Sequence, residues 1–179
     1  MRNKSEMSAG RHSRVDDIVK KSESNIHVSI AASARHELAD SLSMLLSDTY
    51  VLYLKTQNFH WNVRGARFPV LHQLFETQYV EIAAAVDKMA ERIRALGYLA
   101  PASFEEFKSL ASIEEGDSKL QADEMVKRLM LDHEHMAQSF RAMFSKAERD
   151  HDIATADLFT QRMAIHEKFA WMLRATLEE

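Results

Sequence analysis

The sequence contains no cysteine, only four glycines and two prolines, and no long apolar run. Without cysteine the chain has no disulfides, no thiolate zinc sites and no thiol nucleophile. Glycine and proline are the residues that the turns of sheets and loop-rich folds need, so their scarcity argues against a barrel, a sandwich or an α/β fold with many loops.

The hydrophobic residues are dispersed along the chain. No window approaches about 18 consecutive apolar residues, so the sequence predicts no membrane-spanning helix. The first twenty residues are polar and lack the apolar segment of a secretory signal. At 179 residues and 46% apolar content, the chain is expected to form one soluble, intracellular domain with a full core.

The net charge of −4 is unevenly distributed. Residues 1–21 carry six basic and three acidic side chains, a net charge of +3, and the remainder is acidic. We expect residues 1–31 to form a flexible basic arm. Such an arm either contacts a phosphate polymer such as double-stranded DNA or is simply a solvated terminus. Its candidate DNA contacts are Arg2, Lys4, Arg11 and Arg14.

From residue 33 onward, apolar residues recur at intervals of three and four, the period of an α-helix. Pro69 suits the first turn of a helix and Gly97 suits a C-terminal cap. The pattern predicts four long helices, over residues 33–62, 69–96, 120–148 and 154–177.

The connection between the second and third predicted helices is long, and residues 103–107 within it have the composition of a short capped helix. Four long helices with one long middle connection are typical of ferritin-like topology. The sequence therefore predicts an all-α, ferritin-like four-helix bundle over residues 32–179, with a short extra helix in the crossover connection.

The candidate metal ligands are His60, His72, Glu76, Asp87 and Glu91. His72 and Glu76 are four residues apart, as are Asp87 and Glu91, so each pair shares one helical face. Imidazole together with carboxylate oxygen suits iron or manganese. Spacing alone leaves another interpretation open, in which these side chains are solvated and the carboxylates pair with neighbouring basic residues.

The two pairs lie on one predicted helix but far apart. Fifteen residues separate His72 from Asp87, which is about 22 Å along the helix axis. One metal therefore cannot bind both pairs of the same chain. An antiparallel two-fold pairing of this helix would join His72 and Glu76 of one chain to Asp87 and Glu91 of its partner, and would create two equivalent sites. An intrachain ferritin-type site needs Glu-x-x-His on two helices, which the sequence does not provide.

The stretch FHWNVRGARFPVLHQLFETQYVEIAAAVDKMAER resembles the signature of the Dps family, the miniferritins named as DNA-binding proteins from starved cells. Residues 157–174 are similar to the family's last helix, and the likeness covers residues 35–177. This resemblance implies a hollow homo-dodecamer of four-helix subunits, with the short crossover helix at the two-fold interface.

The resemblance also implies ferroxidase sites shared between two subunits. His60, His72 and Glu76 come from one chain, and Asp87 and Glu91 from its partner. Each site takes two irons, oxidises Fe²⁺ with hydrogen peroxide, and supplies a stored ferric mineral. The implied setting is the bacterial cytoplasm, in association with the nucleoid, where removal of iron and peroxide protects DNA from oxidative damage.

Three further residues have expected roles. In the family, an aromatic residue at the position of Trp61 lies near the site and quenches stray oxidising equivalents, although packing at an interface explains it equally well. The family's Asp at the position of Asp157 lines a three-fold pore that admits Fe²⁺. Asp152 is well placed as the N-cap of the fourth helix.

A second functional class remains open at this point. The chain could be a non-specific DNA-binding protein that compacts the nucleoid, with iron oxidation secondary, and the intact set of five ligands argues against a vestigial site. A third class, in which the protein engages cell-surface or immune partners, is not tested by any sequence feature.

Overall fold

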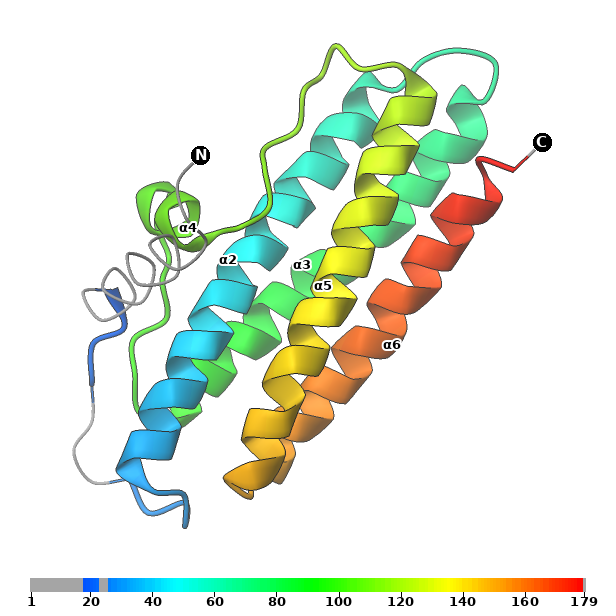
Figure 1. The fold of residues 1–179 in the computed structure, drawn as a ribbon. Coiled ribbons are helices and arrows are strands. Elements are labelled where there is room, and N and C mark those ends of the chain that lie inside the picture. Colours follow the sequence, from blue (N-terminus) through cyan, green and yellow to red (C-terminus); the bar gives the residue numbers. More distant parts are fainter. Residues whose placement is uncertain (1–17, 23–25, 179) are drawn as a thin grey trace, which may run out of the picture.

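The computed structural model describes residues 18–22 and 26–178. Within these ranges the chain forms five α-helices and no β-strand. Figure 1 shows two antiparallel helix pairs, α2 with α3 and α5 with α6, and a long crossover that carries α4 along the side of α2. The helices are α2 (Ala32–Asn62), α3 (Phe68–Ala95), α4 (Phe104–Leu110), α5 (Ala122–Arg149) and α6 (Ile153–Ala175).

This arrangement confirms the predicted all-α, ferritin-like bundle with an extra crossover helix, and the long helices begin and end within two residues of the predicted positions. None of the helices in the described ranges is long and apolar enough to cross a membrane. The predicted DNA contacts Arg2, Lys4, Arg11 and Arg14 lie outside the described residues.

Local capping signals set the ends of α3. Pro69 lies in its first turn, where a missing N–H costs no helical hydrogen bond. At the other end, Gly97 adopts φ +96°, which a residue with a Cβ rarely does. The Gly97 N–H donates to the carbonyl of Arg94 at 2.9 Å and the Tyr98 N–H to that of Ile93 at 3.3 Å, the two bonds of a Schellman cap.

The crossover helix α4 is also capped as expected. The Ser103 side chain accepts from the Glu106 N–H, and the Glu106 carboxylate accepts from the Ser103 N–H, which completes a capping box. The helix continues three residues beyond the predicted Phe107, because Leu110 is fully buried and extends its contact with α2. The capping box and the buried residues together hold α4 against α2.

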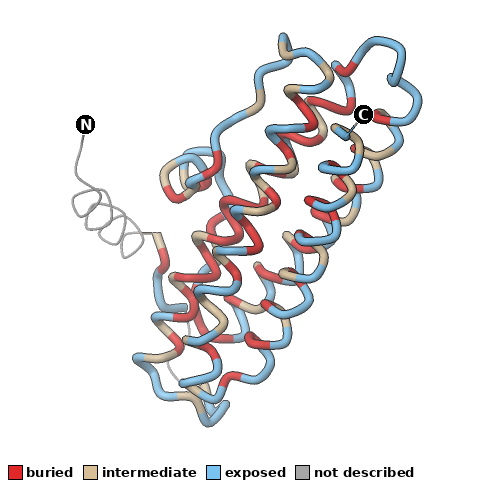
Figure 2. Tube along the Cα trace, turned by 45° about the vertical axis from the view of Figure 1, so that its right-hand side comes forward, coloured by how far each residue is buried: buried red, intermediate tan, exposed pale blue. Residues whose placement is uncertain are grey.

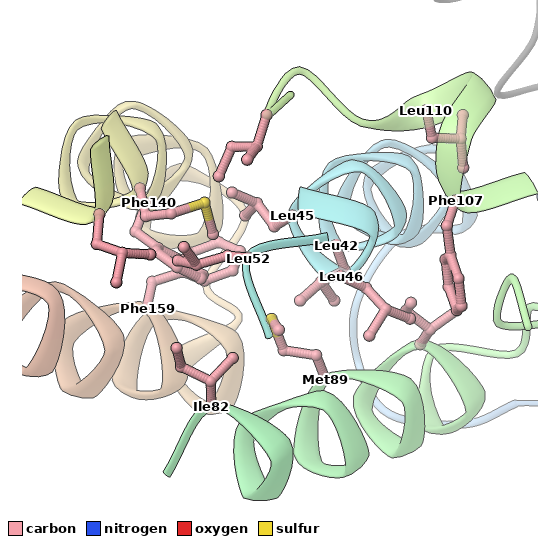
Figure 3. Close-up of a cluster of buried hydrophobic side chains, with 14 of the residues drawn as sticks. Leu42, Leu45, Leu46, Leu52, Ile82, Met89, Phe107, Leu110, Phe140 and Phe159 are labelled. Atoms are coloured by element: carbon pink, nitrogen blue, oxygen red, sulfur yellow. The ribbon is translucent and has the colours of Figure 1, made fainter. Parts of the chain in front are cut away.

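The core is continuous across all five helices. Figure 3 shows leucines of α2 packed against Ile82 and Met89 of α3, Phe107 of α4, and Phe140 and Phe159 of α5 and α6. Figure 2 shows the same division along the trace, with buried positions turned toward the bundle axis and exposed positions outward. The apolar faces expected from the sequence thus form one core.

Part of the expected arm lies against the bundle. Residues 18–22 run beside the end of α3, where the Ser22 N–H donates to the carbonyl of Gly97 at 2.9 Å. Val19 in this segment is only 3% exposed and belongs to the core. Burial of an apolar side chain explains why this segment is held in place, although it falls within the expected arm of residues 1–31.

A connected polar cluster lies inside the bundle. Arg162 of α6 donates to both carboxylate oxygens of Glu81 on α3, at 2.5 and 2.9 Å. Its Nη2 also lies 3.4 Å from Nε2 of His166. Because a guanidinium only donates, this His166 nitrogen accepts, and its ring proton is on Nδ1. The Nδ1–H then donates to Nδ1 of His133 on α5 at 2.8 Å.

Both histidines are fully buried and held neutral. Burial, and to a smaller degree the charge of Arg162, lowers the pKa of His133 to about 3. Burial, His133 and Arg162 lower the pKa of His166 well below its ordinary value. Arg162 therefore joins the two neutral histidines to Glu81 in one network that spans α3, α5 and α6.

The first prediction compares two leucines on α5. Leu129 is fully buried and Leu131 is 48% exposed. We expect Leu129→Ala to lower the free energy of unfolding by about 2–5 kcal/mol, because it leaves a cavity. We expect the matched Leu131→Ala to change it by less than about 0.5 kcal/mol. Urea unfolding followed by circular dichroism measures both, and equal effects would contradict the assignment of the core.

The second prediction concerns acid stability. His133 and His166 are neutral when folded but take up protons in the unfolded chain below about pH 6.5, so the unfolded state binds more protons. The contribution of these two histidines to the free energy of unfolding is therefore fully present above about pH 6.5 and decreases as the pH falls below that value. Each histidine contributes up to about a tenfold change in the unfolding equilibrium constant per pH unit.

Urea midpoints between pH 7 and pH 4 test this expectation. The slope should decrease in His133→Gln/His166→Gln and persist in His135→Gln, which replaces an exposed histidine of the same helix α5. Ring ¹⁵N chemical shifts provide a measurement that does not depend on the variants folding. A native-state signal of charged imidazole from either buried histidine at pH 5 would contradict the prediction.

Candidate metal centre

The connection between α2 and α3 brings His60 and His72 together. His60 lies in the last turn of α2 and His72 near the start of α3. Their rings stack with centroids 3.7 Å apart and planes 19° from parallel. Gly65 lies in the intervening loop with φ +107°, a conformation that suits glycine at the chain reversal.

Two reciprocal hydrogen bonds orient these rings. His60 Nδ1 lies 2.8 Å from the carbonyl oxygen of His72, and His72 Nδ1 lies 2.8 Å from that of His60. A carbonyl only accepts, so each Nδ1 carries the proton and donates it. In the neutral ring this leaves the Nε2 lone pair as the free nitrogen, which is the usual arrangement of a metal-ligating histidine.

Glu76 follows His72 by one helical turn and is half-buried on the same face of α3. Asp87 and Glu91 lie farther along α3 and are exposed. Because α3 is unbroken over its 28 residues, the separation of about 22 Å between His72 and Asp87 holds. The structure therefore brings His60 and His72 together, with Glu76 nearby, and leaves the Asp87 and Glu91 pair apart from them.

A single chain does not complete a ligand cluster. In the described part of the chain, no three His, Asp or Glu side chains converge closely enough to hold a metal ion. Among the ion pairs of the described residues, neither Asp87 nor Glu91 takes part, so their carboxylates are available to another subunit. Their neighbour Arg92 instead binds Asp152 on α6, with Nη2 2.7 Å from the carboxylate.

Asp152 is the N-cap of α6, as the sequence predicts. Its carboxylate accepts from the Thr155 N–H at 3.0 Å. Burial raises the pKa of this group, but hydrogen bonds from Arg92 and Thr155 outweigh that effect and leave the pKa below its ordinary value. The carboxylate therefore stays charged, and it links α3 to the start of α6.

Trp61 and Asp157, the other predicted site residues, are both exposed on the single chain. Trp61, next to His60, is 62% exposed. Asp157 lies in the second turn of α6 and accepts a hydrogen bond from Gln161 at 2.7 Å. Their surroundings in one chain therefore leave both side chains accessible to a partner subunit or to solvent.

Asp132 and His135, which have the spacing of a possible ligand pair, are engaged elsewhere. The Asp132 carboxylate lies 2.7 Å from Lys55 Nζ, although burial still raises its pKa above the ordinary value. His135 Nε2 lies 2.9 Å from the Ser112 hydroxyl. Both side chains therefore have partners within the single chain.

Tyr79 is a neighbour of the site that the sequence analysis did not identify. Its ring lies edge-on to His60, with centroids 5.1 Å apart. The available signal was its position seven residues after His72, which places both on one face of α3. Its contact with α2 depended on the rotation of one helix against the other, which sequence spacing does not give.

Comparison with known proteins identifies the family of the chain. The family model of the ferritin-like domain matches residues 39–179. The "DNA protection during starvation protein 2" of Bacillus anthracis is 36% identical over 143 residues, which is 80% of this chain and 98% of that protein.

Solved structures extend the likeness to the fold. A Dps protein from Bacillus brevis is 35% identical, with a TM-score of 0.79 over 82% of this chain and 98% of its own. A Dps protein from Vibrio cholerae O1, described as a member of the ferritin-like diiron-carboxylate superfamily, is 27% identical, with a TM-score of 0.83 over 87% of this chain and 99% of its own. With its ferritin-like helices and its extensive identity to these relatives, the chain belongs to the Dps family of ferritin-like proteins.

Proposed function

We propose that this protein oxidises Fe²⁺ with hydrogen peroxide and stores the ferric product inside a shell of twelve copies, and so protects DNA from oxidative damage. The observation that carries the proposal is the reciprocal pair of hydrogen bonds between His60 and His72, which leaves two Nε2 lone pairs free. The diiron-carboxylate description of the Vibrio cholerae relative supports iron as the metal.

Each proposed site combines two half-sites, which are the ligand sets contributed by the two subunits of a pair. His60, His72 and Glu76 of one subunit face Asp87 and Glu91 of its partner, because neither set completes a ligand cluster alone. An antiparallel two-fold pairing of α3 produces two such sites per pair of subunits. The carboxylates supply hard oxygen ligands, which favour Fe³⁺ over Fe²⁺.

The proposed reaction uses two irons per site. Each Fe²⁺ gives up one electron, the O–O bond of peroxide breaks, and two hydroxide ions result. Two irons together supply both electrons, so no hydroxyl radical is released. Asp157 is exposed, and three copies of it around a three-fold pore would concentrate the incoming Fe²⁺.

The third prediction tests whether the site is shared between subunits. His60→Ala and Asp87→Ala should each abolish rapid iron oxidation. In mixed shells, a pair with one chain of each kind keeps one intact site, since His60 of one chain meets Asp87 of the other. Random mixing in equal amounts should therefore restore about a quarter of the parent activity.

Ferric absorbance after anaerobic Fe²⁺ loading and peroxide addition measures this recovery. The control is His135→Ala, which replaces an exposed histidine away from the ligand set and should behave as the parent. If co-assembled mixtures remain inactive, the site lies within one chain or at other residues, and the shared-site proposal fails. If the parent oxidises iron no faster than buffer, the ferroxidase proposal fails.

DNA binding is the second candidate function, and the basic character of residues 1–21 favours it. The printed name of the Bacillus anthracis relative refers to DNA protection. Twelve arms on one shell would bind DNA multivalently and without base recognition. This function would place the protein at the bacterial nucleoid, and it operates independently of the iron sites.

The fourth prediction separates the two functions. A chain without residues 1–17 keeps the buried Val19 and should assemble normally. It should lose the DNA retardation that the parent shows in a gel shift at low salt, while iron oxidation persists. Substitution of Arg2, Lys4, Arg11 and Arg14 by alanine should give the same loss, because charge carries the contact. Unchanged retardation in both variants would exclude the arm as the DNA contact.

A further inference from the structure

Gln78 is an amide side chain in the apolar interior of the bundle. Among the side chains that α3 buries, all within the described part of the chain, it is the one polar member, and Phe75 and Ile82 are its neighbours on the same face. Gln78 is fully buried, and neither its Nε2 nor its Oε1 has a hydrogen-bond partner among the described residues. Because an unpaired buried amide costs free energy, Gln78 has the properties of a side chain that binds a small polar ligand.

Contacts between α3 and α6 place Gln78 at the level of His166. The two helices are antiparallel, because Glu81 bonds Arg162, whereas Arg92, farther along α3, bonds the first turn of α6. Gln78 lies three residues before Glu81, which is about 4.5 Å along α3. His166 lies four residues after Arg162, which is about 6 Å along α6 in the same direction. Spacings of three and four also keep each pair on one helical face, so Gln78 and His166 lie at nearly the same height.

Contacts with α2 place His133 at this height as well. The tyrosine that follows Gln78 packs against Tyr53 of α2, with ring centroids 6.2 Å apart. The aspartate that precedes His133 bonds Lys55 of α2 at 2.7 Å. Tyr53 and Lys55 are two residues apart, about 3 Å along the helix axis. Gln78 of α3 and His133 of α5 are both fully buried and therefore lie in one layer of the interior.

Two more unpaired groups belong to this polar layer, which consists of Gln78, His133, Arg162 and His166. Nδ1 of His133 accepts the proton of His166, so the proton of the neutral His133 ring is on Nε2. This Nε2–H is buried and has no acceptor among the described residues. Nε of Arg162 is likewise buried and unpaired. The layer therefore combines two N–H donors with an amide that both donates and accepts.

We propose that Gln78, His133 and Arg162 hold a water molecule in the interior of each subunit. The water oxygen accepts from His133 Nε2–H and Arg162 Nε–H, and the water donates to Gln78 Oε1. Buried waters typically make about three such bonds to groups that lack other partners. This water links α3 to α5 and α6 inside the bundle. It is independent of the iron chemistry proposed above.

The charges of the polar layer favour water over an ion. A metal cation needs lone pairs, whereas His133 Nε2 and Arg162 Nε present protons. An anion needs an unpaired positive charge, but both carboxylate oxygens of Glu81 already accept from Arg162. Burial of an ion without a counter-charge is costly. A neutral molecule that both donates and accepts fits the groups present.

A crystal structure of the assembled protein, at a resolution that shows ordered water, tests the proposal directly. We expect a peak of solvent density in each subunit, at hydrogen-bond distance from Gln78 Oε1 and His133 Nε2. The proposal is overturned if no peak lies there or if Gln78 bonds His133 directly. Anomalous scattering from the peak, which indicates a metal or chloride ion, would also overturn it.

The stability of Gln78→Met provides a second test. Methionine is similar in length to glutamine but has no strongly polar atom. If the water is bound, this substitution removes one of its partners, and the unfolding equilibrium constant should rise by about tenfold. If the layer is dry, the substitution removes two unpaired polar atoms and should lower the constant. An unchanged or lower constant therefore contradicts the proposal.

Gln138→Met is the matched control, because Gln138 is exposed on α5 and the same atoms change there in solvent. We expect it to alter the unfolding equilibrium constant by less than about twofold. Urea unfolding followed by circular dichroism measures the parent and both variants. The crystal structure of the parent decides the question even if Gln78→Met does not fold. Neither measurement involves iron, so failure of this proposal leaves the proposed function unaffected.

Discussion

The length of α3 keeps its two pairs of candidate metal ligands too far apart to meet within one chain. The helix runs unbroken from Phe68 to Ala95, so His72 and Asp87 are separated by about 22 Å along its axis. Under the proposed function, iron chemistry is thereby linked to assembly. An isolated subunit carries two half-sites, whereas a two-fold pair carries two complete ones.

The interior of the bundle serves a different purpose from its surface. Arg162 neutralises Glu81 and donates to His166, which in turn bonds His133. These groups bond one another, although His133 Nε2 and Arg162 Nε are buried without a hydrogen-bond partner among the described residues, and a metal cation there would have to compete with a guanidinium. Polar residues inside the subunit therefore join α3, α5 and α6. The candidate metal ligands lie instead at the end of α2 and along α3.

Aromatic residues connect the proposed metal centre with the crossover. Tyr79 touches His60, and Tyr50 packs beneath α4, which its capping box holds against α2. Each ring contributes to packing through its apolar area. The same rings form a continuous series of contacts from α3 through α2 to α4.

Local signals in the sequence were sufficient for the helices. Apolar residues at a spacing of three and four, Pro69, Gly97 and the Ser103 capping box predicted their number, order and approximate ends, and the structure confirmed these. The spacing of His72 and Asp87 also followed from the sequence, because rise per residue is a local property of a helix. The shared ligand set itself stays a prediction, since it involves a second chain.

Contacts between helices were decided only by the tertiary structure. The reciprocal bonds of His60 and His72, the pairing of His133 with His166, and the contact of Tyr79 with α2 all join residues on different helices. Val19 was likewise found in the core, although it falls in a polar segment. Periodicity shows which face of a helix is buried, but the rotation and height at which two helices pack depend on how their side chains interlock.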